Sequence, residues 1–211
     1  MEFEEAMASV NEGIKVGSKV GAEINLDFSV EGPLGEPFND AYMRGETLKW
    51  LVESSDESAV EMRDAVSSTY SRMAANVASV VDKYYKVSDR WNELATNDKK
   101  GYDSDLKRFM GTHQTVTESF LAKVIEKTKG VDERNKFIDV LDGTGFGFVE
   151  GIEIDIVNKN GDKKVYLKYE KDLPDGKKFE FSEEITPDLL KEIINDKVNL
   201  DQAVSNKIMI S

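Results

Sequence analysis

Residues 66–94, VSSTYSRMAANVASVVDKYYKVSDRWNEL, carry apolar side chains at alternating intervals of four and three positions. The series comprises Val66, Tyr70, Met73, Val77, Val80, Tyr84, Val87, Trp91 and Leu94. This spacing places one apolar stripe along one face of an α-helix. Because no Gly or Pro occurs between residues 46 and 100, we predict one long helix from about residue 58 to residue 95. Its stripe must pack against another helix.

The sequence before this stretch indicates an earlier helix and a break. Apolar residues from position 42 to position 52 predict a helix that begins near Asn39 or Asp40. Residues 54–57 and 58–61 both fit the capping-box pattern, in which Ser is followed three positions later by Glu. We therefore expect a break or a kink near these residues, before the long helix begins.

A second apolar stripe follows Gly101. It comprises Leu106, Met110, His113, Thr117, Phe120 and Val124, again at intervals of four and three. Asp103 or Ser104 is a suitable cap for a helix that would end at Gly130. Two consecutive helices with matching stripes predict an antiparallel helical hairpin. A third, shorter helix is expected over residues 132–141.

The C-terminal part changes to the period of a β-strand. Isoleucines at positions 152, 154 and 156 alternate with acidic residues, and residues 160–161, Asn-Gly, form a strong hairpin-turn signal. The return strand is expected over 163–170, and Phe179 and Phe181 mark a third strand. Thr186 followed by Pro187 predicts the start of a helix. Residues 208–210 are predicted to form a last short strand.

The first 40 residues contain a helix pattern followed by a strand pattern. The helix pattern comprises Phe3, Met7, Val10 and Ile14. The strand pattern comprises Val20, Ala22, Ile24, Leu26, Phe28 and Val30, which alternate with polar residues and glycine. Because a three-stranded meander alone is a thin scaffold, we expect this N-terminal strand to join the C-terminal sheet.

The predicted fold is therefore α+β. A long antiparallel helical hairpin and a shorter helix are inserted into a mostly antiparallel sheet made of the N-terminal strand and the C-terminal meander. Three segments correspond to these parts. Residues 1–38 hold the N-terminal helix and strand, residues 39–142 form the helical module, and residues 143–211 form the β-meander with its C-terminal helix.

Composition and charge narrow the classes of function. The chain has 211 residues, no Cys, 39% hydrophobic residues and a net charge of −13. The lack of Cys excludes disulfides, thiolate metal sites and Cys nucleophiles. Since no basic cluster occurs, we expect no direct nucleic-acid binding. No apolar run is long enough to cross a bilayer, and the acidic first residues do not resemble a signal peptide. We expect a cytoplasmic or virion-associated protein.

The residues that resemble catalytic or ligand sites are better explained by structure. His113 has no carboxylate three or four positions away. The glycines of residues 143–147 precede a strand, whereas a phosphate loop precedes a helix. Residues 156–167 lack calcium ligands at the first and last loop positions. Glu153 and Asp155 fit an exposed strand face. We predict no catalytic, cofactor-binding or metal-binding residue and no enzyme, although catalysis by carboxylates leaves no sequence signature.

Three aromatic residues on the long stripe are the candidate interface. Tyr70, Tyr84 and Trp91 are bulkier than the side chains that a two-stranded coiled coil prefers. They fit internal packing in a helical bundle or contact with another chain, and both can occur along one long helix. The leading hypothesis is a non-catalytic interaction or assembly protein that binds a protein partner or self-associates, such as a structural component of a bacterial or phage particle.

Two other functions are compatible with the sequence. Residues 1–40 contain nine acidic and two basic residues. Glu23, Asp27 and Glu31 lie on one side of the predicted N-terminal strand and form a candidate acidic face. Such a face would suit an inhibitor or immunity protein that blocks a basic, nucleic-acid-binding site on a partner. The long helices would also suit a membrane-active protein that rearranges on contact with lipid.

Overall fold

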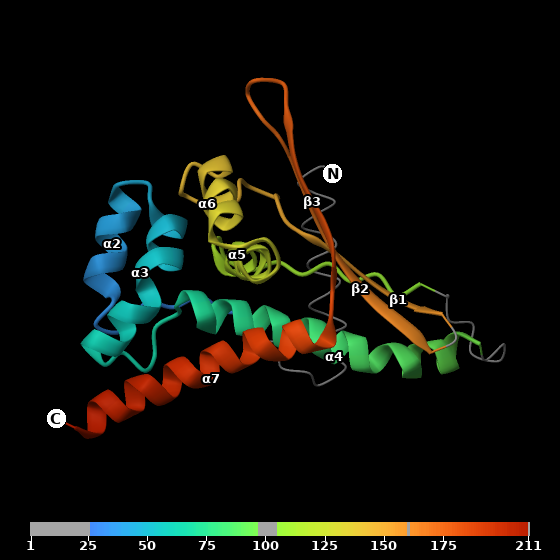
Figure 1. The fold of residues 1–211 in the computed structure, drawn as a ribbon, viewed down its shortest axis with the longest axis horizontal. Coiled ribbons are helices and arrows are strands. Elements are labelled where there is room, and N and C mark those ends of the chain that lie inside the picture. Colours follow the sequence, from blue (N-terminus) through green and yellow to red (C-terminus); the bar gives the residue numbers. More distant parts are fainter. Residues whose placement is uncertain (1–25, 97–104, 160, 211) are drawn as a thin grey trace.

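The computed structural model describes residues 26–96, 105–159 and 161–210, and it confirms a mixed α+β fold with an antiparallel sheet (Figure 1). The helices are α2 (Gly35–Met43), α3 (Thr47–Met62), α4 (Tyr70–Ala95), α5 (Val116–Lys129), α6 (Val131–Val140) and α7 (Pro187–Met209). The strands are β1 (Glu153–Lys159), β2 (Asp162–Asp172) and β3 (Lys178–Ile185).

The long helix begins at Tyr70, so its predicted start near residue 58 is wrong. Helix α3 instead continues through the predicted break and ends at Met62. The chain turns at residues 63–69 because Asp64 Oδ1 accepts the N–H groups of Val66 at 2.9 Å and Ser67 at 2.8 Å. Burial opposes the ionisation of Asp64, yet these hydrogen bonds hold the pKa of its carboxyl below its ordinary value.

The second helix of the predicted hairpin also begins later than expected. Residues 105–113 have no regular secondary structure, and α5 starts after Thr115, whose φ is 78°. A capping box between Thr115 and Glu118 fixes this start. His113 therefore lies outside any helix, with its ring centroid 6.4 Å from that of Phe28. Helix α5 packs against α4. The two helices cross, since Figure 1 looks along the axis of α5 while α4 runs across the view. The third helix, α6, is confirmed.

The predicted meander is confirmed, with the strand order β1-β2-β3 and both pairs antiparallel. The predicted N-terminal strand does not join it within the described residues. Residues 26–30 are not a strand, and the backbone of Ser29 among them bonds to the turn after α3. Ser68 N–H donates to Ser29 O at 2.6 Å, and Ser29 N–H donates to Ser68 Oγ at 3.0 Å. Residues 20–25 and the N-terminal helix pattern lie outside the described residues.

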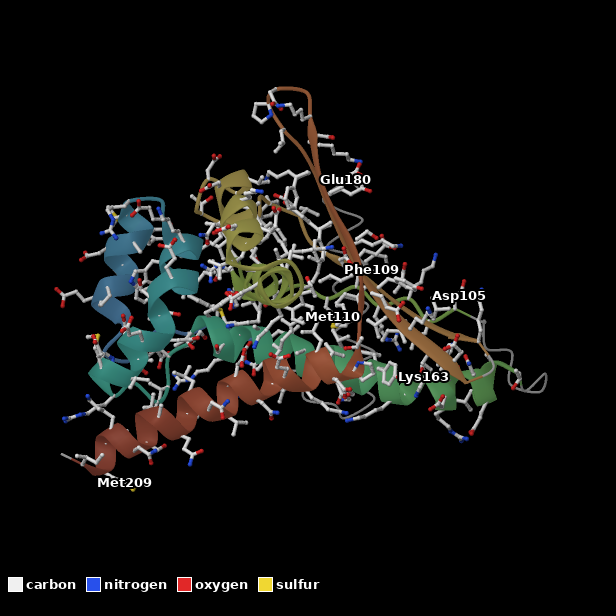
Figure 2. The ribbon with its side chains drawn as sticks, in the orientation of Figure 1. Asp105, Phe109, Met110, Lys163, Glu180 and Met209 are labelled. Atoms are coloured by element: carbon white, nitrogen blue, oxygen red, sulfur yellow. The ribbon has the colours of Figure 1, made fainter. Side chains whose placement is uncertain are left out.

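Helix α7 links the sheet to the helical part. It follows β3 directly and lies alongside α4 (Figure 1). Residues 208 and 209 belong to this helix, so the predicted last strand is wrong. Met209 lies at the end of α7 that is remote from the sheet (Figure 2). The main core cluster contains Phe120 of α5, Phe137 of α6, Leu167 of β2 and Ile193 of α7, so helices and sheet share one core. Among the described residues, no helix has the length and apolarity to cross a membrane.

Candidate functional site

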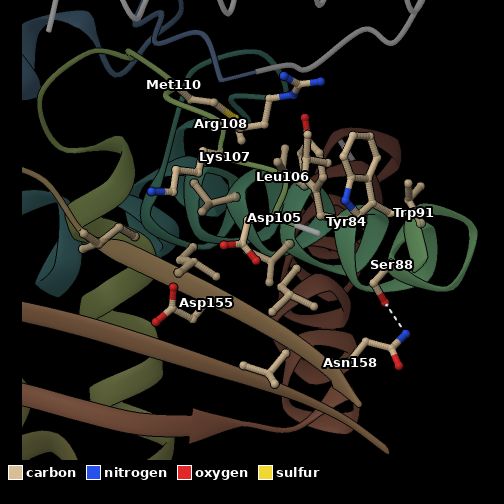
Figure 3. Close-up of a pocket in the computed structure, with 18 of the residues that line it drawn as sticks. Tyr84, Ser88, Trp91, Asp105, Leu106, Lys107, Arg108, Met110, Asp155 and Asn158 are labelled. Atoms are coloured by element: carbon tan, nitrogen blue, oxygen red, sulfur yellow. Dashed lines mark hydrogen bonds between the residues drawn. The ribbon is translucent and has the colours of Figure 1, made fainter. Parts of the chain in front are cut away.

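The candidate site is a cavity of about 720 Å³ between α4, β1 and residues 105–110. This volume lies within the range of known ligand pockets. Its apolar walls come mainly from three parts of the chain (Figure 3), and Leu26 of the segment before α2 adds to them. Helix α4 contributes Val80, Tyr84, Val87 and Trp91, β1 contributes Ile154 and Ile156, and the irregular segment contributes Leu106 and Met110.

The three aromatic residues of the candidate interface lie in two different environments. Tyr84 and Trp91 line the cavity, and each is half-buried. They lie two helical turns apart, on the side of α4 that faces β1 and residues 105–110 (Figure 3). Tyr70, at the beginning of α4, is only 3% exposed and is not among the cavity residues. Of the stripe, Val66 precedes α4 and is 72% exposed, Tyr70 and Met73 are core, and the second part faces the cavity.

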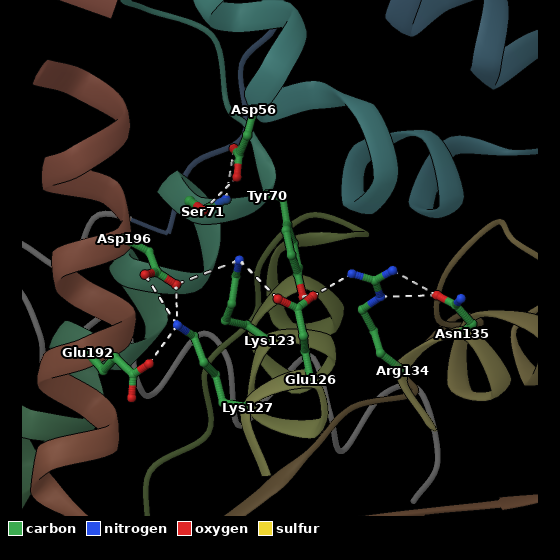
Figure 4. A network of polar contacts seen from close by, with 10 residues as sticks. All are labelled: Asp56, Tyr70, Ser71, Lys123, Glu126, Lys127, Arg134, Asn135, Glu192 and Asp196. Carbon is green, nitrogen blue, oxygen red and sulfur yellow. Dashed lines mark hydrogen bonds and ion pairs between the residues drawn. The ribbon is translucent and has the colours of Figure 1, made fainter. Parts of the chain in front are cut away.

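Tyr70 belongs to a polar network that joins α4, α5 and α7 (Figure 4). Its hydroxyl donates to Glu126 Oε2 at 3.2 Å, and Lys123 Nζ lies 3.8 Å from the centroid of its ring. Lys123 also lies 3.7 Å from a carboxylate oxygen of Asp196 on α7. Burial, reinforced by the nearby Glu126 carboxylate, raises the pKa of the Tyr70 hydroxyl well above its ordinary value. The hydroxyl therefore remains a donor.

A polar clamp fastens α4 to the β1–β2 turn at one end of the cavity. Asn158 Nδ2 donates to Asp89 Oδ1 at 2.8 Å and to Ser88 Oγ at 3.2 Å. Asn92 Nδ2 donates to the backbone oxygen of Asn158 at 3.0 Å. Lys163 Nζ donates to Asp89 Oδ2 at 2.8 Å, and this bond, with that from Asn158, lowers the pKa of Asp89. The clamp fixes the distance between the two main walls.

The charged residues of the cavity come from its two non-helical walls. Residues 105–110 contribute Asp105, Lys107 and Arg108, and β1 contributes Asp155 and Lys159. Asp155 Oδ2 accepts a hydrogen bond from Lys168 Nζ at 2.5 Å, and this bond raises the pKa of Lys168. The described residues hold no group of three or more His, Cys, Asp or Glu side chains placed to bind a metal ion. The arrangement favours the binding of an apolar group flanked by charges.

The glycines of residues 143–147 connect two helix N-termini. Gly143 O accepts the N–H of Lys49 in the first turn of α3 at 3.1 Å. Phe146 N–H donates at 2.8 Å to Oε1 of Glu118 in the first turn of α5, and the same oxygen accepts Thr115 N–H at 2.9 Å. Burial raises the pKa of Glu118, although these hydrogen bonds oppose the shift. This segment therefore has a structural role in the fold.

The other residues that the sequence singled out lie apart from the cavity or at its rim. Asp27 and Glu31 are exposed and lie on irregular chain, so the strand face predicted for them is wrong in the described part. Glu23 lies outside the described residues. Glu153 and Asp155 both lie near Lys168 Nζ, at 3.9 and 2.5 Å.

No family model, curated protein or solved structure matches this chain. The sequence predicts the position of Tyr84 and Trp91 on the helix stripe but not the other two walls. The helical spacing of Leu106 and Met110 predicts a helix where residues 105–110 are irregular. The edge of β1 is not predicted, because the alternating pattern of residues 20–30 predicts a strand that joins the sheet.

Proposed function

We propose that this protein is a non-catalytic interaction or assembly protein that binds an apolar segment of a protein partner in the cavity between α4 and β1. The observation that supports this most is the position of Tyr84 and Trp91, which face a cavity of about 720 Å³ whose other walls combine aliphatic and polar residues. Tyr and Trp are enriched at protein interfaces because they supply a large contact area at a low cost in conformational entropy.

Two polar residues of the cavity, Asp155 and Asn158, support a binding role over a catalytic one. Asp155 is engaged by Lys168, and Asn158 is engaged by α4. A general base or acid needs a side chain that is able to reach a substrate proton, and these two groups already have partners. A structural component of a bacterial or phage particle is the setting that the sequence analysis favours.

Selection of a random peptide library on the full chain tests this proposal. We expect the selected peptides to bind Tyr84→Ala and Trp91→Ala at least about tenfold more weakly than the unmodified protein, the effect of about 1.4 kcal/mol lost at an interface. Tyr42→Ala is the matched control, because Tyr42 is an aromatic residue of α2 with 62% exposure and lies outside the cavity. Peptides that bind all three variants equally well, or a library that yields no binder, would contradict the proposal.

A further inference from the structure

The cavity borders the edge of strand β1. The cavity residues of this strand include the uninterrupted run 154–159. Successive side chains of a strand point to opposite faces of the sheet. A cavity that contacts every residue of a run therefore faces the edge of the strand instead of one face. Because the strand order is β1-β2-β3, this edge is the one that β2 leaves uncovered.

The register identifies the backbone groups on that edge. Lys159 lies opposite Asp162, with two residues between them. Residues that flank a two-residue turn exchange hydrogen bonds with each other, and bonded and non-bonded pairs then alternate along the ladder. The N–H and C=O groups of Ile154, Ile156 and Asn158 therefore point away from β2. The bond from Asn92 to Asn158 O has this direction.

Among the described residues, the outward groups of Ile154 and Ile156 have no backbone partner. In the parts of the chain that the structure describes, no backbone hydrogen bond outside the ladder involves either residue. Both residues are half-buried, and their side chains pack against the main core. Unpaired N–H and C=O groups on a strand edge are a template for another extended chain. Here that edge opens into a cavity walled by Tyr84 and Trp91.

The charges around this edge select the kind of chain that fits. Lys107, Arg108 and Lys159 border the cavity, and none of them forms an ion pair within the described residues. Asp105 is the one acidic cavity residue in the described chain without such a pair, since Asp155 is held by Lys168. Among the described residues the border is thus locally basic, although the protein carries a net charge of −13. It complements acidic groups on the bound chain.

We propose that the occupant is an extended segment of a partner protein, with alternating apolar residues and acidic residues at its ends, which pairs as a fourth strand with Ile154 and Ile156. This inference rests on the proposed function and specifies the mode of binding. Alternate side chains of the segment would enter the space between β1 and Tyr84 and Trp91. The main-chain hydrogen bonds would supply affinity, and the aromatic wall and basic border would supply specificity.

Residue-by-residue amide hydrogen exchange on the full chain tests the strand mode. The probe is a synthetic acetylated and amidated peptide, Glu-Val-Thr-Val-Thr-Val-Glu. In the free protein we expect the amides of Ile154 and Ile156 to exchange faster than those of Asp155 and Val157, which bond to β2. The peptide at millimolar concentration should slow exchange at Ile154 and Ile156 by about tenfold or more, the result of forming new ladder bonds. The same peptide with its central Val N-methylated should bind about tenfold more weakly.

Charge reversal at the border supplies a matched control. The double variant Lys107→Glu with Arg108→Glu changes two exposed residues of the irregular segment. It should weaken binding of the Glu-ended peptide by about threefold, the scale of exposed ion pairs, and strengthen binding of a Lys-ended peptide by a similar factor. Equal affinities for the two peptides in both proteins would contradict the assigned charge preference.

The remaining outcomes separate this inference from the proposed function. Binding that depends on Trp91 without slower exchange at Ile154 and Ile156 would overturn the strand mode alone. Slow exchange at both amides in the free protein would also overturn it. If the slow exchange rate of these amides does not depend on protein concentration, the occupant is a segment of this chain itself. If the rate depends on protein concentration, the occupant is a second copy of the chain. Failure of the Glu-ended peptide to bind at all would overturn the inference, whereas the library selection decides the function.

Discussion

At the scale of single residues, Glu118 shows how burial couples the fold to pH. Its side chain is 1% exposed, and its Oε1 accepts the N–H groups of Thr115 and Phe146. Burial raises its pKa above the ordinary value of 4.5. The folded protein therefore holds this proton more tightly than the unfolded chain does. The contribution of Glu118 to stability is full below pH 4.5 and decreases as pH rises through the raised folded pKa.

Glu118→Gln tests this coupling. The amide keeps one acceptor oxygen for the two N–H groups and removes the titrating proton. We expect the variant to lose the decrease in the free energy of unfolding that Glu118 causes above pH 4.5. Urea unfolding at a series of pH values measures this effect. An unchanged pH dependence in the variant would show that Glu118 is not the responsible group.

Position 32 requires glycine because the Asp64 carboxylate lies close to its Cα. A Cβ atom at this position would lie 2.3 Å from Asp64 Oδ2, the oxygen that accepts Leu34 N–H at 3.1 Å and Ser67 Oγ at 2.7 Å. We expect Gly32→Ala to lower the free energy of unfolding by about 1–3 kcal/mol, since the carboxylate must move from its partners.

Gly151→Ala is the control for this substitution. A Cβ atom at Gly151 would meet no atom within 4 Å, so we expect a change of no more than about 0.5 kcal/mol. Thermal or urea unfolding of both variants makes the comparison. Equal stabilities for Gly32→Ala and Gly151→Ala would contradict the role assigned to the Asp64 turn.

At the scale of elements, the spacing of apolar residues correctly predicted the helices and strands that bury one face in the core. The four-three repeat gave the body of α4, and the alternating isoleucines with the Asn-Gly turn gave β1 and β2. The ends of the helices depend on distant partners. The break after α3 requires Asp64 to bond Leu34, and Arg72 Nη2 to bond Asp64 O at 3.0 Å. The partners in these contacts lie outside residues 54–61. The local capping patterns in those residues therefore predicted the break at the wrong place.

The polar clamp holds α4 and the β1–β2 turn together. Asn158→Ala removes the two side-chain hydrogen bonds to Ser88 and Asp89 and the one that its Oδ1 accepts from Gly161 N–H. We expect the free energy of unfolding to decrease by about 1–2 kcal/mol, and amide exchange to become faster in the second half of α4. The control is Asn195→Ala, because Asn195 is exposed on α7. A stability change equal to that of the control would show that the clamp does not hold the two elements together.

At the scale of the whole molecule, the cavity arises where the shared core ends. The first half of α4 is covered by α3, α5 and α7, and its second half extends beside β1 (Figure 1). The sequence predicted that Tyr84 and Trp91 lie on the helix stripe. It did not predict that residues 105–110 are irregular, since their apolar spacing matches a helix. It also did not predict that no described strand covers the outer edge of β1, because the backbone of Ser29 bonds to the turn after α3.

The fluorescence of Trp91 reports whether the cavity binds an apolar segment of another protein. The chain has two tryptophans, so Trp50→Phe leaves Trp91 as the only one, at the wall of the cavity. Selected peptides without Trp are added to this full-length variant. We expect a saturable shift of the emission to shorter wavelength and weaker quenching by acrylamide, because the bound segment excludes water from the indole. Peptide binding that leaves the emission and quenching of Trp91 unchanged would contradict it.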